Sequence, residues 1–208
     1  MQSRVISVTE AGNFPPDFVQ AGEKVFELVP DNITNFLAER PPQQYITQAI
    51  INTRTQAVCS PYTIQRSDCM GHLCKDGTER LFVPLARLAQ VMGQVGSLMC
   101  LFEDMEIGQT DSLVLAKNVS EVGTSQPRIQ IGESKAKLMF LVPGLPLQIV
   151  AEPIEDDSIH AGSAMTTVFC FGRIVTRMRV DYTIMPYDSF VRFYDMQQQK
   201  LADELAKM

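Results

Sequence analysis

Short stretches rich in β-branched and aromatic residues, separated by glycine and proline, follow one another from residue 79 to residue 186. They read ERLFVP, GSLMCLFEDMEI, DSLVLAKNV, PRIQIG, AKLMFLVPG, LPLQIVAEP and AMTTVFCFGRIVTRMRVDYTIMP. Such runs are typical of strands, and the last is long enough that we expect a bend or bulge near Gly172. Between the first and second of these stretches lies LARLAQVMGQ, which has the spacing of a helix. No strand–helix alternation of the βαβ type is present, so the pattern favours an antiparallel sheet.

The sequence therefore predicts a mainly β protein, an antiparallel β-sandwich of about eight strands with jelly-roll-like layout and short loop helices. We expect an extended N-terminal arm or lead-in over residues 1–44, the β-sandwich domain over 45–187 and a C-terminal amphipathic helix over 188–208. Helical spacing brings Phe190, Tyr194, Leu201 and Leu205 near one face of that last segment. A face this apolar predicts docking on the same chain or on a neighbour.

The composition bounds the class of protein. At 208 residues the chain is long enough for one well-packed domain. No window approaches the roughly 18 apolar residues of a membrane span, and the N-terminus lacks the pattern of a signal peptide. Five scattered cysteines then indicate reduced thiols in a cytoplasmic setting.

The polar residues are of an unusual kind. The chain has 11 Arg against 7 Lys, together with 11 Met and 16 Gln. Protein interfaces are enriched in Arg and Met and depleted in Lys. The composition therefore indicates a surface that touches other copies of the chain or related subunits, although compositional drift explains it equally well.

Three arginines in the last strand stretch form a candidate contact surface. Regular alternation places Arg173, Arg177 and Arg179 on one face of the sheet. Their guanidinium groups cannot share a dry core, so they must face water, acidic groups of a partner or phosphates. The alternatives are a solvated face, a salt-bridge seam between proteins and a limited contact with nucleic acid. The net charge of −6 argues against strong general binding of nucleic acid.

The stretch CMGHLCKDG carries the densest chemistry in the sequence. Cys59, Cys69, His72 and Cys74 could form a Cys3His zinc set, since zinc takes four sulfur or nitrogen ligands. However, His72 and Cys74 are separated by one residue only, and no second well-spaced pair exists. A plain loop between strands is therefore favoured, and a cysteine–histidine catalytic pair is still less favoured because such residues normally come from distant segments.

Two groups of carboxylates have the oxygen ligands that calcium takes. One comprises Glu103, Asp104 and Glu106, and the other lies between Glu152 and Asp157. No calcium-loop spacing is present, so solvated acidic surface is the favoured interpretation. No nucleophile elbow, phosphate loop or dinucleotide motif occurs, and the sequence accordingly predicts neither a cofactor nor a small-molecule substrate, and no enzyme.

Over residues 45–187, the strand spacing, the interposed helices and the Lys-poor surface resemble the single jelly-roll coat proteins of small icosahedral viruses. This resemblance implies a structural self-assembling subunit of a capsid, located in the virion. The chain departs from the common plant-virus pattern because it lacks a basic N-terminal arm. The alternative is a non-enzymatic accessory or binding module in the cytoplasm, which would contact protein or nucleic acid through the Arg173–Arg179 strand face.

Overall fold

The fold is described from a computed structural model. It describes residues 4–7, 18–20, 23–37, 43–107, 110–123, 128–131, 134–137, 141–154 and 161–206. Within these ranges no helix is long and apolar enough to cross a membrane.

Eight antiparallel strands form the main sheet, in the order β1-β2-β3-β4-β10-β11-β12-β7. In chain order they are β1 (Arg4–Ser7), β2 (Lys24–Leu28), β3 (Ala49–Asn52), β4 (Val58–Thr63), β7 (Ser112–Gly123), β10 (Pro146–Ile154), β11 (Ala161–Cys170) and β12 (Arg173–Pro186). The predicted mainly β, antiparallel class is correct.

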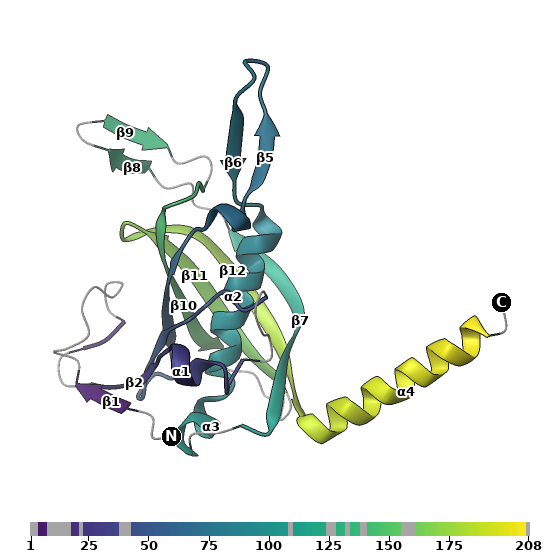
Figure 1. The fold of residues 1–208 in the computed structure, drawn as a ribbon. Coiled ribbons are helices and arrows are strands. Elements are labelled where there is room, and N and C mark those ends of the chain that lie inside the picture. Colours follow the sequence, from purple (N-terminus) through teal and green to yellow (C-terminus); the bar gives the residue numbers. More distant parts are fainter. Residues whose placement is uncertain are drawn as a thin grey trace.

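Helix α2 (Leu85–Met99) occupies the concave side of this sheet, as Figure 1 shows. It packs against β4, β10, β11, β12 and β7. Val91, Met92, Val95 and Leu98 of this helix are fully buried. Apolar residues spaced three and four apart place these side chains on one face, which the sheet covers. The core therefore lies between one curved sheet and a helix, and the sandwich of two facing sheets predicted from the sequence is not the arrangement observed.

The prediction of a strand over GSLMCLFEDMEI is wrong. Helix α2 runs on to Met99, and a second helix, α3 (Phe102–Ile107), follows after a turn. Leu101 and Met105 are buried in the same core as α2. A short, continuous apolar run fits a buried helix as well as a buried strand. Here the run is helical, because in this form its side chains fill the concave side of the sheet.

The long stretch around Gly172 forms a hairpin of β11 and β12. Phe171 and Gly172 make its turn with φ angles of 49° and 71°, a region that glycine adopts readily. The pairing also shifts register between Val168 and Phe169. The chain therefore reverses fully at Gly172, where the sequence predicted a bend or bulge within one long strand.

The predicted arm over 1–44 contributes described strands to the main sheet. β2 pairs with β3, β1 extends the sheet beyond β2, and a short helix, α1 (Pro30–Ile33), follows β2. Two further hairpins stand apart from the main sheet: β5 (Met70–Leu73) with β6 (Glu79–Phe82), and β8 (Arg128–Ile131) with β9 (Ser134–Lys137). One 3-10 turn (Arg66–Asp68) precedes the first hairpin.

The C-terminal segment is helical, as predicted. Helix α4 (Tyr187–Leu205) begins directly after β12 and projects away from the sheet (Figure 1). The backbone N–H of Tyr187 donates to the carbonyl of Asp111 at 2.7 Å, which ties the first turn to the start of β7.

Candidate functional site

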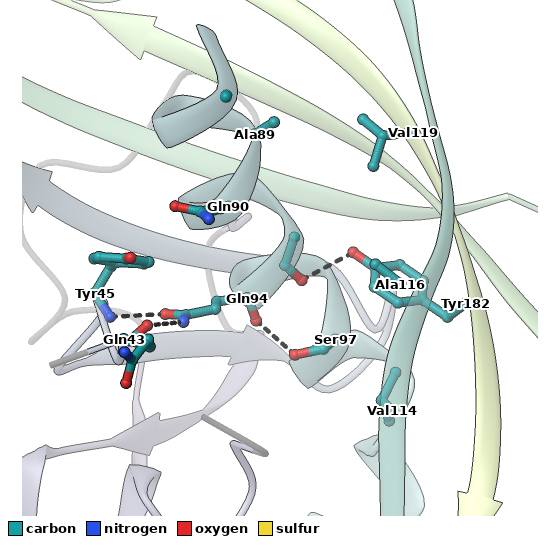
Figure 2. A pocket seen from close by; sticks show the side chains of 12 residues that line it. Gln43, Tyr45, Ala89, Gln90, Gln94, Ser97, Val114, Ala116, Val119 and Tyr182 are labelled. Atoms are coloured by element: carbon teal, nitrogen blue, oxygen red, sulfur yellow. Dashed lines mark hydrogen bonds between the residues drawn. The ribbon is translucent and has the colours of Figure 1, made fainter. Parts of the chain in front are cut away.

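A cavity of about 350 Å³ lies between α2 and β7. Figure 2 shows its walls: one side of α2, the edge strand β7 and the segment that precedes β3. Small or neutral side chains line it throughout, namely Gln43, Tyr45, Ala86, Ala89, Gln90, Gly93, Gln94, Ser97, Val114, Ala116, Val119 and Tyr182. We call it the α2–β7 cavity.

The floor of the cavity is fixed by Gln94. Its carbonyl oxygen accepts from the backbone N–H of Tyr45 at 2.8 Å, and its amide donates to the carbonyl of Gln43 at 2.6 Å (Figure 2). The side chain is only 3% exposed, so these bonds offset the cost of burying an amide. Gln94 thus fastens the segment before β3 to the helix, and both its carbonyl and its amide group are engaged within the chain.

Two glycines of α2 have opposite surroundings. A Cβ on Gly96 would stand 2.0 Å from the hydroxyl oxygen of Tyr182, whereas a Cβ on Gly93 would meet nothing within 4 Å. The Tyr182 hydroxyl donates to the carbonyl of Gly93 at 3.0 Å, and this tyrosine is 1% exposed. Gly96 therefore makes room for the tyrosine that joins β12 to the helix, and Gly93 leaves the cavity open.

Arg87 of α2 lies against Tyr45, one of the residues that line the cavity. The guanidinium carbon of Arg87 lies 4.6 Å from the ring centroid of Tyr45, and the Arg87 side chain also donates to the tyrosine hydroxyl. Nearby, the amide of Gln90 points outward from α2 (Figure 2). Arg87 thus places a positive charge beside a lining residue, and Gln90 contributes an amide donor to the lining itself.

The lining offers hydrogen-bond donors without an acid or a base. Among the described residues that line the α2–β7 cavity there is no carboxylate, imidazole, thiol or ammonium group. Amide and hydroxyl groups can stabilise a negative charge that develops on a carbonyl oxygen, but they are poor proton acceptors near neutral pH. The arrangement suits binding and polarising a carbonyl group.

A second cavity, of about 400 Å³, lies at the other end of α2, where it meets α3 and the ends of β10 and β11. Glu103 and Asp104 line it, together with Cys100 and Ser163. Burial raises the pKa of the Cys100 thiol to about 12, so this cysteine is a poor nucleophile. The side chain of Glu106 and the carboxylates at 155–157 lie outside the described residues.

The four residues of the possible zinc set, which the sequence did not favour, are not brought together. Cys69 directly precedes β5, His72 lies within β5, and Cys74 lies in the turn of the exposed β5–β6 hairpin. Cys59, in contrast, is buried in the main sheet. Burial raises the pKa of Cys59 to about 12. Across the ranges given above, no group of three or more His, Cys, Asp and Glu side chains is placed to hold a metal ion. CMGHLCKDG thus forms one strand and the turn of a hairpin.

The arginines of β12 lie as follows. Arg173 and Arg177 are exposed, and Arg179 is partly buried. The Nε of Arg179 donates to Oδ1 of Asp181 at 2.7 Å, and its terminal nitrogen donates to Ser163 at 3.3 Å. Arg179 is therefore engaged within its own chain, on the side of the sheet away from α2.

The predicted contact residues of the C-terminal helix all lie on α4. Tyr194, Leu201 and Leu205 are exposed, and Phe190 is half-buried, with its ring centroid 6.2 Å from that of Tyr194. These side chains are far from the α2–β7 cavity along the helix that leaves the body. None of the cavity residues was predicted from the sequence, although the glutamines and glycines of LARLAQVMGQVGSLM recur at helical spacing.

Comparisons with known proteins were made by sequence and by structure. No protein-family model and no curated protein matches the sequence. Among solved structures, the dehydratase heterocomplex ApeI:P of Xenorhabdus doucetiae is similar at a TM-score of 0.50 and 17% identity, over 78% of this chain and 97% of that chain. A thioesterase-superfamily member of Thermus thermophilus is similar at a TM-score of 0.52 and 10% identity, over 79% of this chain and 99% of that chain.

These similarities show the fold, which is the hotdog fold: one antiparallel sheet wrapped around a helix. They overturn the expected relation to jelly-roll coat proteins. The predicted function as a capsid subunit in a virion is wrong for the same reason, and the alternative of a non-enzymatic module that works through the arginine face is not favoured. Strand spacing misled the prediction because hotdog and jelly-roll sheets both consist of short antiparallel strands.

Proposed function

We propose that this protein binds an acyl thioester, with the acyl chain in the α2–β7 cavity. The proposal is supported chiefly by the position of that cavity, against the central helix of a hotdog body. The two structural neighbours are described as a dehydratase heterocomplex and a thioesterase-superfamily member, so an acyl-thioester ligand is the natural candidate.

The walls of the cavity suit an acyl chain. Ala89, Gly93, Val114 and Ala116 contribute small apolar groups from α2 and β7. The volume of about 350 Å³ falls within the range of about 300–1,000 Å³ usual for small-molecule sites. An acyl chain that leaves water for such walls gains roughly 0.8 kcal/mol for each buried methylene group.

The rim suits the polar part of the ligand. The Gln90 amide can donate a hydrogen bond to the thioester carbonyl. This hydrogen bond strengthens as negative charge develops on the carbonyl oxygen. Arg87 lies beside the lining residue Tyr45, where its positive charge favours the phosphates of coenzyme A or of a carrier-protein arm. Gln94 and Tyr182 already bond within the chain and so shape the wall.

Turnover of the bound thioester requires a proton acceptor. Since the described lining residues supply no carboxylate or imidazole, we expect the isolated chain to bind acyl-coenzyme A and to turn it over slowly. A related hotdog subunit could supply the missing acid or base. The similarity to a heterocomplex favours this arrangement over an enzyme that acts alone.

Isothermal titration calorimetry tests the proposal. Octanoyl-coenzyme A should bind at least about tenfold more tightly than free coenzyme A, because its chain enters the apolar cavity. Gly93→Leu should abolish this preference, since the new side chain fills the open space beside Gly93. The same substitution should keep or raise thermal stability, because glycine is unfavourable within a helix by about 1 kcal/mol.

The matched control is Leu115→Phe, which enlarges an exposed side chain next to the cavity strand residues Val114 and Ala116. It should leave the preference for octanoyl-coenzyme A unchanged. Equal binding of the acylated and free coenzyme, or an undiminished preference in folded Gly93→Leu, would contradict the proposal.

A further inference from the structure

Helix α4 is a long helix that the body of its own chain does not cover. It contains 19 residues, none of which is buried, and every residue from 191 to 206 is exposed. Figure 1 shows the helix extending away from the sheet after the hydrogen bond that Tyr187 donates to Asp111. Among the described elements, its main contacts with the body are with β12 and β7.

One stripe of α4 follows a heptad pattern along the whole helix. Its members are spaced alternately four and three residues apart, the spacing that keeps side chains on one seam of a coiled coil. This stripe, the α4 seam, comprises Tyr187, Val191, Tyr194, Gln198, Leu201 and Leu205. The five apolar members are 37% to 60% exposed.

A helix with such a seam needs a partner. Most helical stability in proteins comes from the packing of an apolar face rather than from helix propensity. Phe193 and Met196 add further exposed apolar surface in the first half of α4. The seam is therefore a contact surface rather than a solvated face.

We propose that the α4 seam pairs in parallel with the α4 seam of a second copy of this chain, as a two-stranded coiled coil. In this register Gln198 of one helix lies opposite Gln198 of the other. The polar seam residue therefore contacts a second polar side chain. An antiparallel pairing would set it against apolar seam residues. A single polar residue at such a position is known to fix register and the number of strands.

The residues flanking the seam agree with parallel pairing. Residues on one flank then face those on the other flank of the partner, five positions further on. Asp195 faces Phe190 of the second copy, and Gln197 faces Ala202, so no two carboxylates stand opposite each other in these layers. Like charges are therefore kept apart.

The exposed area is also sufficient. Five half-exposed apolar seam side chains on each helix supply on the order of 1,000 Å² when both are covered, which is the lower bound of a specific interface. The inference concerns assembly of the chain and does not depend on what the α2–β7 cavity binds.

Disulfide trapping in the full-length protein tests the pairing. Leu201→Cys, on the seam, should form a disulfide between copies under mild oxidation, identified as a 201–201 linked peptide by mass spectrometry because five native cysteines are present. Asp203→Cys, on the opposite side of the helix, is the matched control and should cross-link at least tenfold less. No linked peptide at 201, or equal yields at both positions, would overturn the proposal.

Hydrogen exchange provides a second, independent readout. Tyr194→Glu/Leu201→Glu puts two charges on the seam and should remove the protection of α4 amides. Met196→Glu/Gln199→Glu adds the same charge off the seam and should preserve it. Because α4 contains no buried residue, neither variant disturbs the core of the body. Unprotected α4 amides in the unsubstituted chain, or equal losses in both variants, would count against the coiled coil.

Discussion

Asp181 shows how one charged side chain is held on the outer face of the sheet. Its Oδ1 accepts from Arg179 at 2.7 Å and from the hydroxyl of Ser163 at 2.8 Å, and its Oδ2 accepts from Asn118 at 3.3 Å. The pKa of Asp181 is held below its usual value, most strongly by the hydrogen bond from Arg179 and next by the one from Ser163. Three strands, β7, β11 and β12, are thereby linked through one carboxylate.

A pH-dependent contribution to stability follows from this lowered pKa. The folded-state pKa lies below the unfolded one, so the contribution is present at neutral pH and is lost as the pH falls through the folded-state pKa. Asp181→Asn should lower the free energy of unfolding at pH 7 by up to about 1 kcal/mol, since the pair is partly exposed. Urea unfolding should show this deficit shrinking below pH 3.8, the usual Asp pKa.

Asp188→Asn, on α4, removes a carboxylate without touching these contacts and is the control. If Asp181→Asn lowered the free energy of unfolding equally at pH 7 and at pH 2.5, its effect would come from altered packing and not from the lost charge.

At the scale of the element, α2 owes its place to the close approach of β12. Gly96 leaves just enough space for the hydroxyl of Tyr182, which then bonds to the carbonyl of Gly93. The helix is thus bonded to the sheet by a side chain that is itself almost entirely buried. The two glycines of α2 therefore have different roles: Gly96 allows the Tyr182 hydroxyl to approach the helix, and Gly93 leaves the α2–β7 cavity open.

A double-mutant cycle tests this packing. Gly96→Ala should lower the free energy of unfolding by about 1–3 kcal/mol, because its methyl group overlaps the Tyr182 hydroxyl. Tyr182→Phe alone should cost about 0.5–1.5 kcal/mol for the lost hydrogen bond. Together they should cost less than the sum by at least 0.5 kcal/mol. Thermal or urea unfolding measures all three, and strict additivity would show that the two residues do not meet.

Prediction from the sequence succeeded for elements whose pattern is local. The strand DSLVLAKNV and the C-terminal helix were identified because β-branched runs and helical spacing carry that information. It failed where tertiary packing decides, as at GSLMCLFEDMEI, whose apolar run ends α2 and forms α3. The role of Gly93 and Gln94 could not be read locally either, because the cavity exists only once β7 and the segment before β3 reach the helix.

At the scale of the whole molecule, the same strands can be arranged around a helix or against a second sheet. The sequence predicted the second arrangement, and the structure has the first, with α2 supplying the layer that a second sheet would have formed. A helix in that position creates the α2–β7 cavity along its uncovered side. The proposed acyl-thioester site is therefore a direct consequence of how the sheet and helix are layered.

The most direct test of this account is paramagnetic broadening of NMR signals by an acyl-coenzyme A that carries a nitroxide on its acyl chain. We expect selective broadening of signals from Ala89, Gly93 and Val114, which line the α2–β7 cavity. Signals from Cys100 and Gly162, in the second cavity, should remain sharp. Broadening at the second cavity instead, or at no cavity residue, would contradict the account.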